Sequence, residues 1–285
     1  MGVTIGEMLL ITLLPLSPHT MSDTNTNQEP VLTDEQILEF EQQIKDEEAQ
    51  KIPLVCQENS IHTLKEEFKN NEPFLKKIEN LSKIHDKIRK CRGDGNCFYR
   101  ALSFAWFESA MKDPAKYNDR LAKLKQTCEL LESSGFEKLA FEDFYDVTLQ
   151  QYESLNQNDP DMLLVGFQSD EISNAIVMHF RFIASAFLRI HAAEYEPFLV
   201  DEMVSIDEFC SMHVEAFGRE SDHLQIIALS RALDVPIQVV YLDGGVGDEA
   251  AIHEFWPSDQ DEREKTKTPI KLIYRPGHYD ILYEM

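Results

Sequence analysis

The stretch GDGNCFYRALSFAWFESAM, residues 93–111, joins a cluster of turn-forming residues to a long apolar run. Gly93 to Asn96 predict a tight turn, because glycine, aspartate and asparagine tolerate backbone conformations that other residues avoid. The run that follows predicts a helix with Cys97 at its first position. Unpaired N–H groups and the positive end of the helix dipole at such a position favour a thiolate over a thiol. The same N–H groups can bind an oxyanion that forms on an attacked carbonyl group.

Taken alone, this segment supports a structural interpretation about equally well. A helix can begin at a buried cysteine that has no chemical role, which is the usual state of a free cysteine. A phosphate-binding loop is a weaker alternative, because no Lys-Ser/Thr pair follows the glycines. A nucleophilic cysteine also requires a base, and the chain contains nine histidines.

His278 is the best candidate base, because of the sequence RPGHYDIL around it, residues 275–282. In a strand, residues i and i+2 point to the same face, so His278 and Asp280 are expected side by side while Tyr279 faces away. Asp280 can then accept a hydrogen bond from one ring nitrogen and direct the other toward a nucleophile. An exposed His–Asp pair on a terminal strand is the better interpretation until Cys97 is considered with it. The two features together favour catalysis.

The other histidines fit structural roles better than catalytic ones. His223 follows Ser221-Asp222 at a helix start, where capping or loop packing is expected. Three more (His179, His191 and His213) lie in helical patterns, and His253 is expected in a loop near Trp256. No pair has the H-E-x-x-H spacing, so we predict no metal and no cofactor.

The composition is strongly acidic, with 51 Asp and Glu against 27 Lys and Arg and a formal net charge of -24. A surface of this charge repels phosphate backbones, so nucleic acid is not an expected partner. A basic partner fits better. Solubility alone explains the charge at least as well.

Cysteine usage and hydropathy indicate the compartment. The five cysteines (Cys56, Cys91, Cys97, Cys128 and Cys210) are an odd number without a C-x-x-C pair, which argues against a disulfide framework or a zinc site. Reduced thiols predict a cytoplasmic or nuclear protein. The apolar run at residues 8–15 lacks a preceding Lys or Arg and is too short to span a membrane. We therefore expect no membrane association, and interpret residues 1–20 as an extension upstream of an alternative start at Met21.

The chain divides into three predicted parts. Residues 1–32 are expected to be a disordered extension because they are polar and turn-rich. Residues 33–52 predict an acidic amphipathic helix: Thr33 to Gln36 form a capping box, and Ile37, Phe40 and Ile44 form an apolar stripe. This helix can dock on its own domain, which we slightly favour, or bind a partner. Residues 53–285 form one domain.

Helical patterns dominate the first part of that domain. We expect helices within residues 60–90, 118–133, 141–155 and 170–193, with further helix starts at Ser205 and Ser221-Asp222. Strands are expected late, at residues 236–243, 270–274 and 278–283. Helices first and a small sheet last predict an α+β domain.

Four segments together resemble one enzyme family. DGNCFYRAL at 94–102 resembles the nucleophile motif of OTU-family deubiquitinases, and the Phe-Tyr after the cysteine resembles their otubain branch. ESDHLQIIALSRAL at 220–233, PIQVVYLD at 236–243 and LIYRPGHYDILYEM at 272–285 resemble otubains in the same order. Gly93 departs from the family pattern, which has proline there, and is expected to loosen the loop.

This resemblance implies a papain-like OTU fold, with a helical region packed on a small central β-sheet, and an isopeptidase activity on ubiquitin. By position, Cys97 matches the nucleophile, His278 the general base and Asp280 the residue that orients it. Asp94 matches the position that shapes the oxyanion hole. A small-molecule transferase with the same chemistry is a much weaker interpretation of the four matched segments.

The resemblance also implies partners. Otubains similar to this chain prefer ubiquitin chains joined through lysine-48, and they bind and restrain ubiquitin-charged E2 enzymes without cleavage. In them the N-terminal helix contacts the proximal ubiquitin, which suggests that residues 33–52 bind ubiquitin or a charged E2. A monomer is expected. The alternative is a ubiquitin- and E2-binding regulatory protein whose peptidase is weak or dormant.

Overall fold

The computed structural model describes residues 51–285 except residues 112, 156–158, 200–203, 246 and 259–266. The predicted disorder of residues 1–32 lies outside the described residues. So does the predicted helix at residues 33–52, apart from its last two positions, which form a turn and a bend.

A six-stranded sheet runs through the described region in the order β1-β2-β6-β5-β3-β4. Its strands are β1 Val55–Ser60, β2 His85–Cys91, β3 Ile237–Tyr241, β4 Ala251–Phe255, β5 Ile270–Arg275 and β6 His278–Glu284. The β3–β5 pair is parallel and the remaining pairs are antiparallel. This mostly antiparallel sheet beside many helices confirms the predicted α+β class.

Strands β5 and β6 form a hairpin around the two-residue turn Pro276–Gly277, in which Gly277 has a φ of +73°. The register pairs Arg275 with His278 across this turn. Because side chains alternate along a strand, β6 presents different residues to the two sides of the sheet. Tyr279 and Ile281 join the larger hydrophobic core, whereas Leu282 joins a smaller one.

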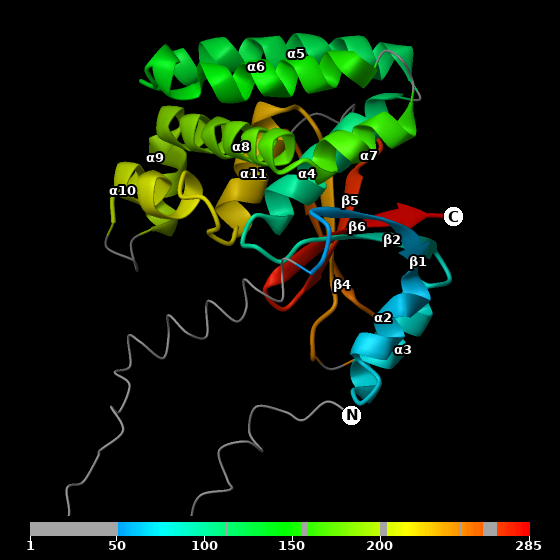
Figure 1. The fold of residues 1–285 in the computed structure, drawn as a ribbon. Coiled ribbons are helices and arrows are strands. Elements are labelled where there is room, and N and C mark those ends of the chain that lie inside the picture. The colour runs from blue at the N-terminus through cyan, green and yellow to red at the C-terminus, as the bar shows by residue number, and fades with distance from the viewer. Residues whose placement is uncertain (1–50, 112, 156–158, 200–203, 246, 259–266) are drawn as a thin grey trace, which may run out of the picture. The chain divides into compact units, whose positions relative to one another are not determined.

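Helices cover both faces of the sheet (Figure 1). They are α2 Leu64–Glu67, α3 Glu72–Leu81, α4 Cys97–Met111, α5 Pro114–Ser133, α6 Lys138–Ser154, α7 Pro160–Gln168, α8 Asp170–Ile190, α9 Ala192–Tyr195, α10 Ile206–Phe209 and α11 His223–Ala232. Helices α5, α6 and α8 lie together at the top of Figure 1, and α2 and α3 lie at the other end. A π-helical segment, Cys210–Val214, follows α10.

The larger core surrounds α4, which is buried on nearly every side because it lies between α8 and the sheet. This position explains why its sequence is apolar throughout and shows no single apolar stripe. The smaller core lies on the other face of the sheet, where Ile78 of α3 packs with Ile88, Ile273 and Leu282. The two cores hold α4 and the β5–β6 hairpin in fixed positions.

Most expected elements are present. The predicted helices at 118–133, 141–155 and 170–193 correspond to α5, α6 and α8. The helix starts predicted at Ser205 and at Ser221-Asp222 are both present, and each carries a capping box, Ser205–Glu208 and Asp222–Gln225. All three expected strands are also found, as β3, β5 and β6.

The prediction that strands arrive late is wrong, because β1 and β2 precede α4. The helical pattern expected through residue 90 ends at Leu81. Ile84 and Ile88 are spaced as on a helix, but β2 lies between β1 and β6 and pairs with both. Sheet pairing therefore overrides a local pattern that fits a helix.

His253 was expected in a loop and instead belongs to β4, the edge strand that pairs with β3. Four of the five β4 residues are exposed, so the strand carries no clear apolar alternation. Its backbone pairing with β3, which the local sequence does not encode, defines it.

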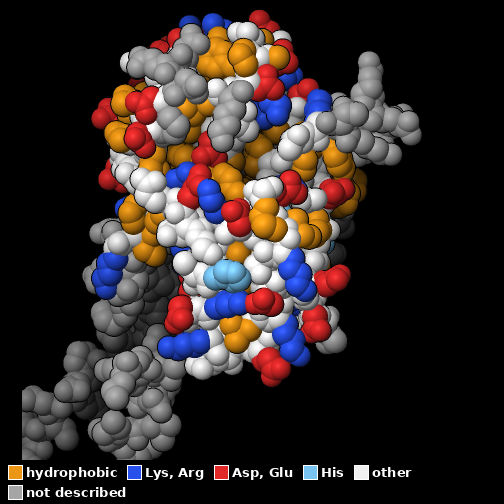
Figure 2. All heavy atoms as spheres, turned by 90° about the vertical axis from the view of Figure 1, so that its right-hand side faces the viewer, with side chains coloured by type: hydrophobic (Ala, Val, Ile, Leu, Met, Phe, Trp, Pro, Cys, Tyr) orange, Lys and Arg blue, Asp and Glu red, His pale blue; other side chains and the backbone are white. Residues whose placement is uncertain are grey.

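Charge is not segregated on the face seen in Figure 2, where Lys and Arg side chains are interspersed with Asp and Glu. Part of the acidic excess lies in residues 1–51, which contain ten acidic and two basic side chains. Within the described ranges no single helix has the length and apolar character needed to cross a membrane. The pair Asp170–Ile190 and Ala192–Phe198, bent by 86°, meets those criteria only jointly.

Candidate active site

Cys97 is the first residue of α4, as the sequence predicts, and it is 4% exposed. Asn96 takes the N-cap position, since its carbonyl accepts the first helical hydrogen bond from the backbone N of Arg100 at 3.0 Å. Its side-chain Oδ1 accepts from the backbone N of Gly218 at 2.9 Å and from Arg181. Oδ1 is thus occupied by groups outside the helix and accepts no hydrogen bond from the first N–H groups of α4.

Arg181 of α8 holds this turn in place through several hydrogen bonds. It is fully buried, and its Nη2 donates to Asn96 Oδ1 at 2.8 Å and to the carbonyl oxygen of Gly95 at 3.1 Å. The same guanidinium binds the carbonyl oxygens of Val214 and Arg219 at 2.9 and 2.7 Å. It also lies over the Tyr99 ring, 4.2 Å from the centroid. Burial lowers the pKa of Arg181, and these acceptors compensate for its lost hydration.

Asp94 is held by a second buried arginine. Its Oδ1 accepts from the backbone N of Asn96 at 2.9 Å, and its Oδ2 accepts from Arg100 Nη2 at 2.6 Å. Arg100 is fully buried and also donates to Ser173 Oγ at 2.6 Å. Both carboxylate oxygens of Asp94 are therefore engaged within the protein, so this side chain can shape the loop without contacting a reacting atom.

His278 and Asp280 lie side by side on β6, as the sequence predicts. His278 Nε2 is 2.8 Å from Asp280 Oδ1. The other ring nitrogen, Nδ1, lies against Gly93, where an added Cβ would be 3.3 Å away. The departure from proline at residue 93 thus places a residue without a side chain directly against the imidazole.

Strand β6 also reaches the sulfur of Cys97. The backbone N of Tyr279 donates to Cys97 Sγ at 3.4 Å, and the Tyr279 ring packs edge-on against Phe98 with centroids 5.4 Å apart. Cys97 is among the groups that raise the pKa of His278, so the two side chains are neighbours. The turn at residues 93–97 and the β5–β6 hairpin, far apart in sequence, therefore meet at the sulfur.

The charges favour a protonated imidazole beside this sulfur. Burial disfavours the charged ring, but hydrogen bonds and charges from Asp280 and Cys97 raise the pKa of His278 to about 10. Burial likewise disfavours ionised Asp280, yet the hydrogen bond of His278 and the charges of His278 and Arg275 hold the pKa of Asp280 below its usual value. An imidazolium held between a carboxylate and a cysteine is the arrangement of a thiol nucleophile with its base.

A cavity of about 310 Å³ opens beside Cys97. Most of the residues that line it are aromatic or acidic, and the whole lining besides Cys97 is Glu220, Ser221, Asp222, His223, Tyr241, Tyr274, Gly277 and Tyr279. His223 begins α11 and its Nδ1 is 2.8 Å from Asp222 Oδ1, which agrees with the helix-start role expected for it. Cys97 itself lines this cavity, so the cavity gives access to the residue.

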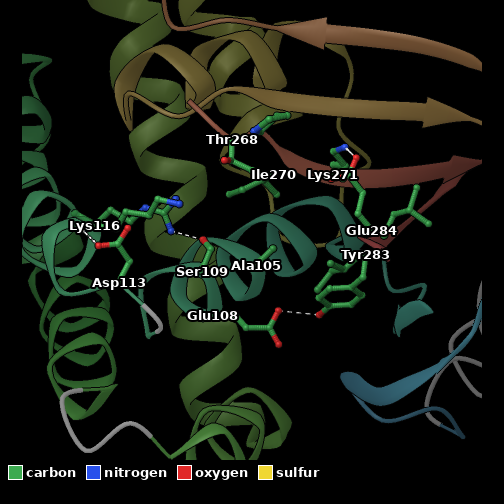
Figure 3. Close-up of a pocket in the computed structure, with 14 residues that line it drawn as sticks. Ala105, Glu108, Ser109, Asp113, Lys116, Thr268, Ile270, Lys271, Tyr283 and Glu284 are labelled. Carbon is green, nitrogen blue, oxygen red and sulfur yellow. Dashed lines mark hydrogen bonds and ion pairs between the residues drawn. The ribbon is translucent and has the colours of Figure 1, made fainter. Parts of the chain in front are cut away.

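A larger cavity, about 480 Å³, lies elsewhere, between α4, α5 and the β5–β6 pair (Figure 3). None of the described residues that line it is a cysteine or a histidine. Its carboxylates are already engaged: Glu108 accepts from the Tyr283 hydroxyl at 2.9 Å, and Glu284 pairs with Lys271. The size of a cavity therefore does not by itself identify the candidate active site.

Several of the other cysteines and histidines are buried side chains. All five cysteines are free thiols, and burial raises the pKa of Cys91 and Cys210. His179 is fully buried in α8, where burial lowers its pKa to about 3. Across the described residues there is no group of three or more His, Cys, Asp or Glu side chains that could hold a metal ion.

A family model described as Peptidase C65 Otubain matches residues 47–284. The chain belongs to the otubain family of cysteine peptidases. It is 36% identical to the OVARIAN TUMOR DOMAIN-containing deubiquitinating enzyme 1 of Arabidopsis thaliana, over 86% of each chain. It is 35% identical to the ubiquitin thioesterase OTUB1 of Homo sapiens, over 88% of this chain and 90% of the relative.

Solved otubain structures are similar to this chain in fold and sequence. A complex described as h/ceOTUB1-ubiquitin aldehyde-UBC13~Ub matches with a TM-score of 0.78 and 32% identity, over 88% of this chain and 98% of the other. A ceOTUB1 ubiquitin aldehyde UBC13~Ub complex matches with a TM-score of 0.77 and 31% identity, over 88% and 100%. The family resemblance and the papain-like OTU fold predicted from the sequence are thus confirmed.

The residues that hold the site were not predicted. Sequence reasoning selected Cys97, His278, Asp280 and Asp94, and the structure places all four in one region. It missed the buried arginines and Arg275, which pairs with Asp280. Arg181 lies within the long, mostly apolar helical pattern at residues 170–193, and a charged residue there was the available signal, because cations are rarely buried without partners.

Proposed function

We propose that the chain is a deubiquitinating cysteine protease that hydrolyses isopeptide bonds between ubiquitins, with a preference for lysine-48-linked chains. The observation that carries the proposal is that Cys97 Sγ accepts a hydrogen bond from the backbone N of Tyr279, next to His278, which Asp280 in turn orients, in an otubain-family fold. The relatives of this chain named as ubiquitin thioesterases support the substrate class. The linkage preference rests on the family resemblance.

The reaction is an acyl transfer. The Cys97 thiolate attacks the isopeptide carbonyl carbon at the C-terminus of the distal ubiquitin, and the N–H groups at the start of α4 stabilise the oxyanion. The tetrahedral intermediate expels the lysine amine, which takes its proton from the His278 imidazolium. His278 then accepts a proton from water, which attacks the thioester. The distal ubiquitin leaves with a free carboxylate, and the thiolate–imidazolium pair is restored.

The cavity beside Cys97 supports a substrate of this shape. It has a volume of only about 310 Å³, it is lined by aromatic rings, and Glu220 and Asp222 give it acidic walls. A tail that ends in two glycines can enter where bulkier residues cannot, and basic residues in that tail would find opposite charge.

A second function, restraint of ubiquitin-charged E2 enzymes, is favoured by a separate observation. Otubain structures similar to this chain are complexes with UBC13~Ub and UBCH5B~Ub. We propose that residues 33–52 bind ubiquitin or the charged E2 as an acidic helix. In the stronger form of this alternative the chain is chiefly a binding protein and its peptidase is weak or dormant.

The proposed function has a direct test. Wild-type protein and Cys97→Ala are incubated with a panel of di-ubiquitins of every linkage, and the products are separated on a gel. The proposal expects cleavage of the lysine-48-linked dimer by the wild type and none by the variant. Absence of cleavage by well-folded wild type would favour the binding protein, and turnover by Cys97→Ala would exclude the nucleophile.

We propose that the protein acts as a monomer in the cytoplasm or the nucleus, where its five free thiols stay reduced. Ubiquitin and charged E2 enzymes are its proposed partners, and neither nucleic acid nor membrane is one.

A further inference from the structure

Arg275 lies directly across the β5–β6 hairpin from His278. It is the last residue of β5 and the register partner of His278. Partners in an antiparallel ladder point to the same face, so Arg275, His278 and Asp280 share one side of the sheet. The Arg275 side chain is only 13% exposed, so its charge is largely withdrawn from water.

The two oxygens of the Asp280 carboxylate have different partners. Oδ1 accepts from His278 Nε2 and from the backbone N of Cys91, both at 2.8 Å. Oδ2 accepts from Arg275 Nη2. Asp280 is fully buried, so an oxygen without a donor would be costly and the carboxylate would tend to rotate. Arg275 therefore keeps Oδ1 directed at His278.

Arg275 is itself held from outside the hairpin. Its Nη1 pairs with Glu67 Oε2, at the end of α2. The other oxygen of Glu67 pairs with Lys90 of β2. A chain of contacts thus runs from α2 through Glu67, Arg275 and Asp280 to His278, and only its outer member, Glu67, has substantial exposure, at 33%.

We propose that Arg275 is a positioning residue for the reaction, anchored by Glu67, and that it acts by fixing the orientation of the Asp280 carboxylate. The catalytic part of this inference rests on the proposed function. The positional part does not, because the state of His278 can be measured without substrate.

Two effects of Arg275 on His278 have opposite signs, which makes the idea testable. As a nearby positive charge, Arg275 disfavours imidazolium, so its removal would raise the pKa of His278. As an orienting donor, Arg275 maintains the hydrogen bond that favours imidazolium, so its removal would lower the pKa. The proposal requires the second effect to be the larger one.

The experiment replaces Arg275 with methionine, which keeps most of the side-chain volume. The pKa of His278 is measured by NMR titration of the full chain, with His278→Gln used to assign the signal. We expect a fall of about one unit or more in Arg275→Met. A rise would mean that Arg275 acts only as a charge, and no change would mean that it serves only packing. Either result overturns the proposal.

Kinetics on lysine-48-linked di-ubiquitin give the second readout. In Arg275→Met, kcat should fall roughly 100-fold with KM nearly unchanged, because the loss is one of alignment and not of substrate binding. Glu67→Gln, which weakens the anchor but keeps its shape, should show a smaller loss of the same kind. A fall in kcat/KM caused only by a higher KM would contradict the positioning role.

Two variants control for folding. Lys90→Met removes the other cation from Glu67 without touching Asp280 and should retain wild-type kcat. Arg275→Lys keeps a charge that can reach only one of the two carboxylates, so it should fold and lie between the wild type and Arg275→Met. If wild type cleaves no di-ubiquitin, the proposed function fails, but the titration still decides whether Arg275 positions Asp280.

Discussion

Gly95 and Gly218 meet backbone to backbone beside Cys97: a Cβ on Gly95 would lie 1.8 Å from the carbonyl oxygen of Gly218. Both residues have positive φ angles, +73° and +80°. The close approach lets the backbone N of Gly218 reach Asn96 Oδ1 and lets Arg181 bind both sides of the contact. The turn before α4 is therefore fixed by a loop more than a hundred residues later in the chain.

Gly95→Ala should damage both folding and turnover. The new methyl group would push the two loops apart and also force a residue with a Cβ into a left-handed conformation, for an expected loss of about 2 to 4 kcal/mol in unfolding free energy. Urea unfolding and di-ubiquitin cleavage measure the two effects. The matched control is Gly135→Ala, at φ +97° with nothing within 4 Å of the added Cβ. It should lose about 1 kcal/mol and keep its activity. Equal losses of stability and activity in the two variants would refute the steric argument.

Arg181→Met should remove the hydrogen bonds that connect α8 to the turn before Cys97. It leaves the carbonyl oxygens of Gly95, Val214 and Arg219 without a buried donor, so we expect a loss of about 3 kcal/mol or more in stability. The kcat per folded molecule should fall as well, because the turn before Cys97 would be mobile even in the folded protein. Arg89→Met is the comparison, because Arg89 is buried among Glu58, Glu108 and Tyr283 away from Cys97. A similar loss of kcat per folded molecule in both variants would argue against a specific role.

Asp280→Asn keeps the shape of the side chain but removes its charge. The imidazolium of His278 loses its counter-charge, and the amide nitrogen cannot accept hydrogen bonds from Arg275 or Cys91. We expect kcat to fall on the order of 100- to 10,000-fold with little change in KM. Steady-state kinetics at several pH values measure this. A variant with near wild-type kcat would remove Asp280 from the mechanism.

The raised pKa of His278 predicts a pH dependence of stability. The folded-state pKa of about 10 exceeds the ordinary value of 6.5, so the folded state retains a proton that the unfolded state loses. The stabilisation is complete below pH 6.5 and is lost as pH rises toward 10. Urea unfolding of wild type and His278→Gln across this range should show a difference that shrinks with rising pH. A constant difference would mean that His278 is not protonated in the folded state.

Deletion of residues 1–52 separates the two proposed functions. If the N-terminal segment binds a charged E2, the truncated protein should lose restraint of ubiquitin transfer while still cleaving a minimal fluorogenic ubiquitin substrate. Ubiquitin-transfer assays with UBC13 or UBCH5B, with Cys97→Ala of full length as a control, measure the first effect. Undiminished restraint by the truncated protein would place E2 binding elsewhere in the chain.

Part of the fold could be predicted from local sequence patterns. Helices α5, α6 and α8 have periodic apolar faces, and β3, β5 and β6 are short apolar runs bounded by turn residues, so each was predictable. Strands β2 and β4 were not, because β2 has a spacing that also fits a helix and β4 is mostly exposed. Their identity comes from pairing with neighbours.

The sequence by itself determined the groups that we propose to react: the turn before Cys97 places it at a helix start, and the i, i+2 spacing places Asp280 beside His278. Only the tertiary structure decided how these groups are held. Arg100, Arg181 and Arg275 reach their partners across separate elements, and Gly218 contacts Gly95 from a distant loop. The physical reason is that strand and helix periodicity relate residues a few positions apart, whereas the partner of a buried charge depends on how whole elements pack.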